Sequence, residues 1–149
     1  MSQYQLAQLN IATLKESLES PSMAEFVANM ERIYALAESS PGFVWRLKDE
    51  EEEARGMRLF GEGVLINMSV WENVEALRDF VFKSAHVEVW RRRREWFAPM
   101  TEAYAVLWWV PTGQYPTVAE AAEKLMQVRQ YGPTTHAFTF REAFTAPDA

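Results

Sequence analysis

One stretch of this chain gathers side chains that could do chemistry: FKSAHVEVWRRRREWF, residues 82–97. It holds His86, four consecutive arginines at 91–94, and the aromatic residues Trp90 and Phe97. An imidazole can accept a proton or ligate a metal near neutral pH. A guanidinium can hold a carboxylate or a phenolate by charge-assisted hydrogen bonds. The stretch therefore predicts the wall of a ligand pocket.

The arginine run cannot be a simple solvated face if the stretch is helical. Residues step by about 100° around a helix, so four consecutive arginines sweep most of its circumference. On a helical wheel, Arg93 falls in the apolar half, Arg94 near its border, and His86 on the same stripe as Arg93. A buried guanidinium is costly unless it is paired. Three outcomes stay open: an ion pair, for example with Asp79 or Glu142 or across an interface; an anionic ligand; or a frayed or kinked helix that lets Arg93 reach water.

His86 is one of two histidines, the other being His136, and the chain has no cysteine. A metal centre with several histidine ligands is therefore not expected, whereas one axial histidine on a haem iron stays open. His86 also lies near a predicted helix start, where the helix dipole disfavours the imidazolium form. The plainer alternative is a hydrogen-bonded core histidine.

Polar residues also occupy two predicted strands that are otherwise apolar: Gln8 and Asn10 on the first, Asn67 and Ser69 on the third. They are candidates for contacting a ligand, or for hydrogen-bonding strand ends or a bulge. We find no Ser-His-Asp arrangement and no tight carboxylate pair in the sequence. The acidic run 50–53 is predicted to be a solvated hairpin loop.

The elements that position these residues follow from hydrophobic periodicity and turn residues. Strands are predicted at 4–12, 43–47, 64–71 and 104–110, with a short final strand at 138–140. Helices are predicted after Ser22, which has capping-box spacing to Glu25, after Asn73, from Ser84 to Met100, and from Thr117, spaced likewise to Glu120, to Tyr131. Gly61 and Gly63 predict a turn and not a dinucleotide site, because a third glycine and a following helix are missing.

The predicted order is β-α-β-β-α-β with an added C-terminal helix, which is the ferredoxin-like order of an α+β fold. One domain is expected over residues 1–149, with 112–149 as a C-terminal extension. The strand at 104–110 is apolar at every position, so both faces of the sheet need a cover. A second copy of the sheet would supply it and give a homodimer through sheet faces. The alternative cover is the C-terminal helix of the same chain.

Composition narrows the classes of partner. The net charge is −6 over 149 residues and the pI is about 5.0, which disfavours nucleic acid and anionic membrane surfaces as partners. Without cysteines, the chain has no disulfides and no thiolate metal sites. The N-terminus resembles no signal peptide and no segment is apolar enough to span a bilayer, so a cytoplasmic location is expected.

Several motifs carry a resemblance to a known group. The order of elements, SVW at 69–71 and FKSAH at 82–86 resemble the dimeric α+β barrel superfamily, which includes antibiotic-biosynthesis monooxygenases and haem-degrading monooxygenases. More closely, NMSVWENVEALRDFV, SAHVEVWRRRREWF, VLWWVP and PTVAEA resemble a bacterial domain-of-unknown-function family within that superfamily. The closer resemblance covers roughly residues 6–141.

The resemblance implies a ferredoxin-like protomer, a dimer, and a pocket between the sheet and its helices. In the haem-degrading branch it implies His86 as iron ligand and Asn10 as the strand asparagine, but Phe80 stands where that branch has a tryptophan. In the cofactor-independent branch, which oxidises electron-rich polycyclic molecules, it implies Asn10 and Asn67 together with Trp71 and Trp90.

Three functions therefore stay open. The first is a monooxygenase-like enzyme, with no cofactor, whose aromatic pocket holds a hydrophobic ligand that can carry an anionic group. Its predicted catalytic residues are His86 and Asn10, and its predicted ligand-binding residues are Arg93, Arg94, Trp90, Trp71, Phe80, Asn67 and Phe97. The second is a haem-binding protein with His86 as axial ligand. The third is a structural homodimer without catalysis.

Overall fold

The computed structural model describes residues 3–83 and 86–148, without the side chains of His86 and Val89. Its strands are β1 (Tyr4–Leu14), β2 (Phe43–Arg46), β3 (Val64–Trp71), β4 (Phe97–Ala98) and β5 (Ala105–Pro111). Its helices are the 3-10 turn η1 (Pro21–Met23), α1 (Ala24–Glu38), α2 (Glu50–Phe60), α3 (Val74–Lys83), α4 (His86–Arg91), α5 (Arg93–Trp96) and α6 (Val118–Tyr131). None of the helices in the described ranges is long and apolar enough to cross a membrane.

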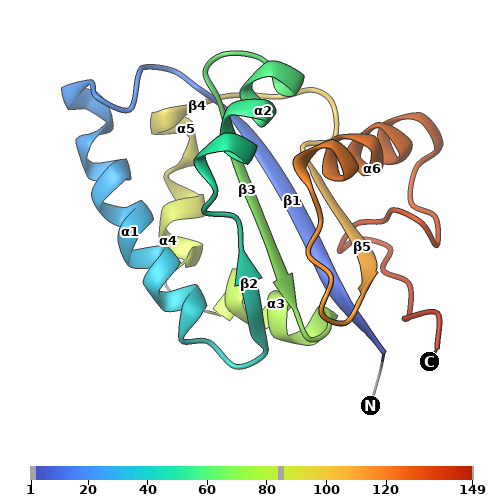
Figure 1. Ribbon diagram of the computed structural model, residues 1–149. Coiled ribbons are helices and arrows are strands. Elements are labelled where there is room, and N and C mark those ends of the chain that lie inside the picture. The colour runs from blue at the N-terminus through green and yellow to red at the C-terminus, as the bar shows by residue number, and fades with distance from the viewer. Residues whose placement is uncertain (1–2, 84–85, 149) are drawn as a thin grey trace.

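The strands form one antiparallel sheet with β1 at its centre (Figure 1). Along the sheet the order is β2-β3-β1, and the other side of β1 pairs with β4 and β5. With β4 set aside, this is the connectivity of a ferredoxin-like unit. The predicted α+β, ferredoxin-like fold class is confirmed, and the four main strands lie where the sequence predicts them.

The acidic run is a helix and not the predicted hairpin loop. Asp49 caps α2, because its carboxylate accepts hydrogen bonds from the backbone N–H groups of Glu51 and Glu52. Acidic residues in a first helical turn also suit the positive end of the helix dipole. Apart from Gly56, the segment consists mostly of good helix formers, and Gly56 and Phe60 face the core, so both propensity and packing favour a helix. The turn predicted at Gly61 and Gly63 is present, and both glycines have positive φ.

Two of the four predicted helix caps are present. The side chain of Asn73 accepts from the backbone N–H of Ala76, and that of Thr117 accepts from Glu120. Ser22 caps nothing, because it lies inside the 3-10 turn η1 and α1 begins after Met23 without a side-chain cap. The predicted cap at Ser84 falls outside the described residues.

One face of the sheet is covered by α6 and α2. Ala7, Leu9 and Ile11 of β1 pack in one buried cluster with apolar residues of α6. Gly56 lets α2 approach β3 closely, since a Cβ atom there would lie 1.6 Å from Cδ1 of Ile66. The C-terminal helix is therefore the cover of this face, and the argument for a dimer through sheet faces loses its premise. A homodimer itself stays a prediction.

The other face of the sheet lies under α1 and α3 to α5 (Figure 1). The open edge of β5 is closed by the C-terminal segment, in which Phe138 exchanges two backbone hydrogen bonds with Leu107. Trp109 also donates from its indole nitrogen to the carbonyl of Phe144. The short strand predicted at 138–140 is thus a single bridge, because only one residue pairs with β5.

Candidate functional site

Four polar side chains form a row across β1 and β3 on the face that α1 covers. Gln8 is paired with Ser69, and Asn10 with Asn67, in the register of the two strands. Since side chains alternate between faces along a strand, all four project to the same side of the sheet. We call these four residues the amide row. Gln8 and Ser69 are buried, whereas Asn10 and Asn67 are half-buried.

The amide row is tied together by side-chain hydrogen bonds. The Gln8 amide donates to Asn67 Oδ1 at 2.7 Å and to Ser69 Oγ at 2.8 Å. The Asn10 amide donates to Gln8 Oε1 at 3.0 Å, and more weakly to Asn67 Oδ1 at 3.4 Å. Among the described residues, no donor reaches Asn10 Oδ1, so the half-buried end of the row keeps a free acceptor.

The row separates two apolar clusters on this face. On one side lie Leu6 and Trp71 with the buried residues of α3, and on the other lie Met23, Phe26 and Trp96. Burying polar groups between apolar clusters costs free energy unless they are hydrogen-bonded. The row meets that condition internally, which makes it a rigid polar strip in an apolar interface.

Trp71 joins the amide row to the first of these clusters. Its indole nitrogen donates to Ser69 Oγ at 2.9 Å. Its ring stacks on Phe80, with centroids 5.2 Å apart, and meets the edge of Phe43 at 5.4 Å. The predicted site residues Asn10, Asn67, Trp71 and Phe80 are therefore brought together by the fold.

Two residues that the sequence reading missed complete this site, Tyr34 of α1 and Arg46 of β2. The guanidinium carbon of Arg46 lies 4.1 Å from the centre of the Tyr34 ring. Burial raises the pKa of the Tyr34 phenol above its ordinary value, and outweighs the hydrogen bond with Asn67 and the charge of Arg46, which lower it. The Tyr34 hydroxyl is therefore neutral at physiological pH. Tyr34 follows Met30 by four residues on the stripe of α1 that faces the sheet, and this helical spacing could have indicated it from the sequence.

The arginine stretch departs from the prediction because its helix breaks. The helix is interrupted at Arg92, between α4 and α5. The helical-wheel prediction assumes one continuous helix and therefore does not hold across the stretch. Arg93 lies 3.6 Å from the ring centre of Trp90, a half-exposed residue, and donates to the Trp90 carbonyl. The kinked alternative is thus the one observed. Asp79, offered as its partner, pairs with Lys83 instead.

Within the arginine run 91–94, it is Arg92 and not Arg93 that forms ion pairs with carboxylates. Its guanidinium contacts both oxygens of Glu25 on α1, at 2.6 and 2.7 Å, and both oxygens of Glu95. It also lies 4.7 Å from the ring centre of Trp96. Arg92 therefore fastens α5 to α1, a structural role.

The other predicted site residues lie apart from the amide row or outside the described part. Arg94 is exposed, and its carbonyl accepts from the Lys15 ammonium. Phe97 packs edge-on against Phe26 in the second cluster. The side chain of His86 is not among those described, so its predicted role stays a prediction. His136 is exposed, and within the described ranges no three His, Asp or Glu side chains gather as metal ligands would.

Comparison with known proteins gives one family. The family described as a domain of unknown function (DUF3291) matches residues 5–149. No functionally curated protein matches the chain.

Solved structures give likenesses at low identity. SnoaB, a cofactor-independent oxygenase from Streptomyces nogalater, is 17% identical over 74% of this chain and 95% of its own, with a TM-score of 0.46. A protein of unknown function from Nitrosomonas europaea is 10% identical over 76% of this chain and 94% of its own, with a TM-score of 0.48. The oxygenase activity is that of the Streptomyces protein.

Proposed function

This chain belongs to the family described as a domain of unknown function (DUF3291), and we propose that it binds a small aromatic molecule against the amide row. We propose oxidation of that molecule by molecular oxygen, of the monooxygenase kind, as the activity. The observation that carries the proposal is the hydrogen-bonded row of Gln8, Asn10, Asn67 and Ser69, set between two apolar clusters beside Trp71.

The groups left over at the half-buried end of the row fit a phenol or an enol. Asn10 Oδ1 can accept from a ligand hydroxyl, and the neutral Tyr34 hydroxyl can donate to a ligand oxygen. The N–H groups of the Asn67 amide can donate to such an oxygen and would stabilise negative charge that develops on it. Apolar side chains on both sides suit the flat body of an aromatic molecule.

The reaction balances without a further reductant. An activated methylene group of the ligand loses both hydrogens and becomes a carbonyl. One atom of dioxygen enters that carbonyl and the other leaves as water, so the ligand supplies all the electrons that dioxygen takes up. The amides and the phenol of the site would hold the enolate formed when the first proton leaves.

The experiment uses dithranol, a tricyclic anthrone, as the probe. Quinone formation and oxygen uptake are measured for the wild type and for the variants Asn10→Ala and Asn67→Ala. We expect each substitution to lower kcat/KM by about a hundredfold, the scale of removing one preorganised donor or acceptor. Asn29→Ala, at a half-buried residue whose side chain hydrogen-bonds within α1, is the matched control and should keep the wild-type rate.

Binding is measured separately with 1,8-dihydroxyanthraquinone, which cannot be oxidised at the same carbon. Binding that Asn10→Ala weakens, together with turnover, supports both parts of the proposal. Binding without turnover removes the enzymatic part and leaves a binding protein. Absence of both, or equal behaviour of the site variants and Asn29→Ala, would overturn the proposal.

A further inference from the structure

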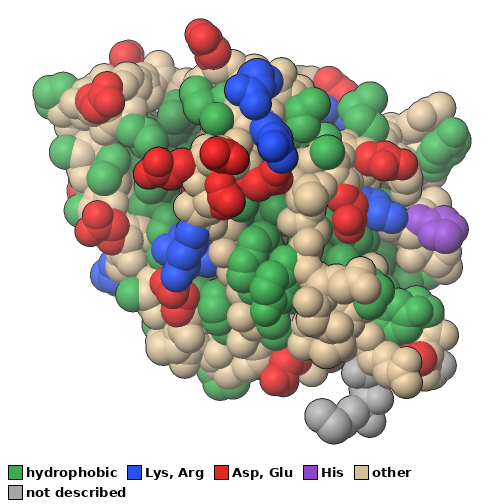
Figure 2. Space-filling model, viewed as in Figure 1, with side chains coloured by type: hydrophobic (Ala, Val, Ile, Leu, Met, Phe, Trp, Pro, Cys, Tyr) green, Lys and Arg blue, Asp and Glu red, His purple; other side chains and the backbone are tan. Residues whose placement is uncertain are grey.

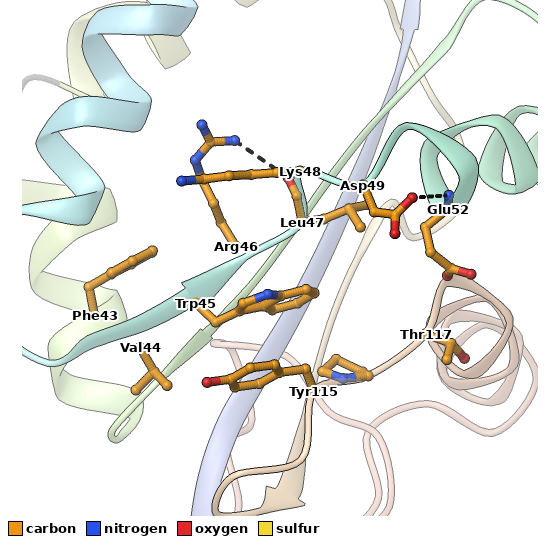
Figure 3. A pocket seen from close by; sticks show the side chains of 11 residues that line it. Phe43, Val44, Trp45, Arg46, Leu47, Lys48, Asp49, Glu52, Tyr115 and Thr117 are labelled. Carbon is orange, nitrogen blue, oxygen red and sulfur yellow. Dashed lines mark hydrogen bonds between the residues drawn. The ribbon is translucent and has the colours of Figure 1, made fainter.

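A cavity lies beside the edge strand β2, and no residue of the amide row lines it. Its volume is about 520 Å³, within the range of small-molecule sites. The residues around it come from β2, the start of α2 and the segment before α6: Phe43 to Asp49, Glu52, and Tyr115 to Thr117 (Figure 3). None of the predicted site residues belongs to it.

The cavity has an aromatic wall. The rings of Trp45 and Tyr115 stack in parallel, with centroids 5.0 Å apart and an angle of 6° (Figure 3). Tyr115 is 51% exposed. Hydrophobic side chains gather on this face of the molecule over β2 and the segment before α6, with acidic side chains above them (Figure 2). The pair offers π faces and edges to a flat ligand.

The two basic side chains that line the cavity, those of Arg46 and Lys48, are already engaged on the other side of β2. Arg46 Nε lies 3.4 Å and Lys48 Nζ 2.9 Å from the carboxylate of Glu38. Arg46 also covers the ring of Tyr34 on the face of the sheet under α1. In Figure 3 both side chains extend away from the Trp45–Tyr115 pair. An anionic ligand at the pair would therefore find no free cation there.

The two helix ends beside the cavity also offer little to an anion. Asp49 occupies the N–H groups of Glu51 and Glu52, and the carboxylate of Glu52 accepts from Val118 at the start of α6. Thr117 accepts from a further N–H of α6. Glu52 is also paired with Arg55. The Asp49 carboxylate, which forms no ion pair among the described residues, is therefore the negative charge on this side of the cavity.

We propose that this cavity binds a flat organic cation, such as a quaternised aromatic nitrogen base. Its ring would lie on an outer face of the Trp45–Tyr115 stack, where the ring face attracts a cation. Its charge would lie toward Asp49. The proposal does not rest on the amide row, although Arg46 borders both sites.

The test compares N-methylisoquinolinium with isoquinoline at mildly alkaline pH, where isoquinoline is uncharged. Both are titrated against the protein by ligand-observed saturation-transfer NMR. We expect saturable binding of the cation, at least about tenfold tighter than that of the neutral base. Two variants test whether the cation binds in this cavity: Tyr115→Leu, which removes one ring of the aromatic pair, and Asp49→Asn, which removes the negative charge.

Each variant has a safeguard against misfolding. Asparagine caps a helix about as well as aspartate, so Asp49→Asn keeps the start of α2. Tyr131→Leu, at a 68% exposed tyrosine of α6, is the matched control for the loss of one tyrosine. We expect cation binding to be about tenfold weaker in both cavity variants and unchanged in the control. Equal affinity for the two probes, no saturable binding, or binding that survives both cavity variants would overturn the proposal.

Discussion

The side-chain amide of Gln8 donates to Oδ1 of Asn67 at 2.7 Å, diagonally across the pairing of β1 with β3. Gln8 is buried and its amide also reaches Ser69. This contact joins the two strands that lie at the middle of the sheet. It fixes the Asn67 amide in the orientation that the proposed site uses.

Replacing Gln8 by leucine should destabilise the protein. The change removes one donor from Asn67 and from Ser69 and removes the acceptor of the Asn10 amide, at a cost of about 1–3 kcal/mol in the free energy of unfolding. Urea unfolding followed by circular dichroism measures it. Gln130→Leu, at an exposed position of α6, is the control and should change stability by less than about 0.5 kcal/mol. Equal stability of the two variants would mean that the row is not a structural element.

Replacing Gly56 by alanine should also destabilise the protein, although alanine is the better helix former by about 1 kcal/mol. The added Cβ would lie 1.6 Å from Cδ1 of Ile66, which is buried. Overpacking of this kind costs about 1–3 kcal/mol. Ile66→Val removes the clashing atom, so the double variant should recover part of the loss. Additive losses in a double-mutant cycle would contradict this contact.

The contribution of Arg92 should depend on pH. Hydrogen bonds and the charge of Arg92 lower the pKa of Glu25 and of Glu95 below the ordinary value of 4.5. A carboxyl group with a lowered pKa in the folded state stabilises the fold above its unfolded pKa, and this contribution is lost as pH falls through the folded pKa. The difference in Tm between the wild type and Arg92→Gln should therefore be largest near neutral pH and shrink below 4.5.

Arg91→Gln is the control for that series, since Arg91 is exposed and makes no ion pair among the described residues. Its Tm difference from the wild type should be small at every pH. A pH-independent difference for Arg92→Gln would show that the stacking on Trp96 dominates, and not the two carboxylates.

Replacing Arg93 by methionine should leave stability within about 0.5 kcal/mol of the wild type. Arg93 contacts a half-exposed Trp90 and pairs with no carboxylate among the described residues, and such exposed stacking contributes little. Thermal unfolding measures this. A loss of several kcal/mol would indicate a buried partner for the guanidinium, as the helical wheel suggests.

A hemin titration separates the haem alternative from the amide-row proposal. Because the proposal places the ligand against amides, we expect no saturable Soret shift on titrating the protein with hemin. A saturable shift that His86→Ala abolishes would favour the haem-binding alternative and the predicted role of His86. The visible spectra of the wild type and of His86→Ala during the hemin titration decide between the two functions.

The strands were predictable because alternation and apolar bulk are local properties. The segment 64–71 is a strand with the predicted bounds, and the caps at Asn73 and Thr117 follow from residue type and spacing. The polar residues of the amide row were visible in the sequence for the same reason. Their shared face follows from strand periodicity, once the register of β1 and β3 is known.

Other features depended on contacts between distant segments. The helix break at Arg92 coincides with a pair of hydrogen bonds to Glu25, 67 residues away, which no periodicity reveals. The cover of the second sheet face was a choice between α6 and another copy, and the packing of α6 on β1 decided it.

The sequence by itself thus determined the order of elements, the ferredoxin-like fold class and the residue types of the amide row. Only the tertiary structure decided which arginine is paired, which helix covers the sheet, and that Trp45 meets Tyr115. The physical reason is that these interactions differ in how far along the chain they reach. Propensity, capping and alternation act within a few residues, whereas ion pairs, ring stacking and face coverage depend on which remote segments the fold brings into contact.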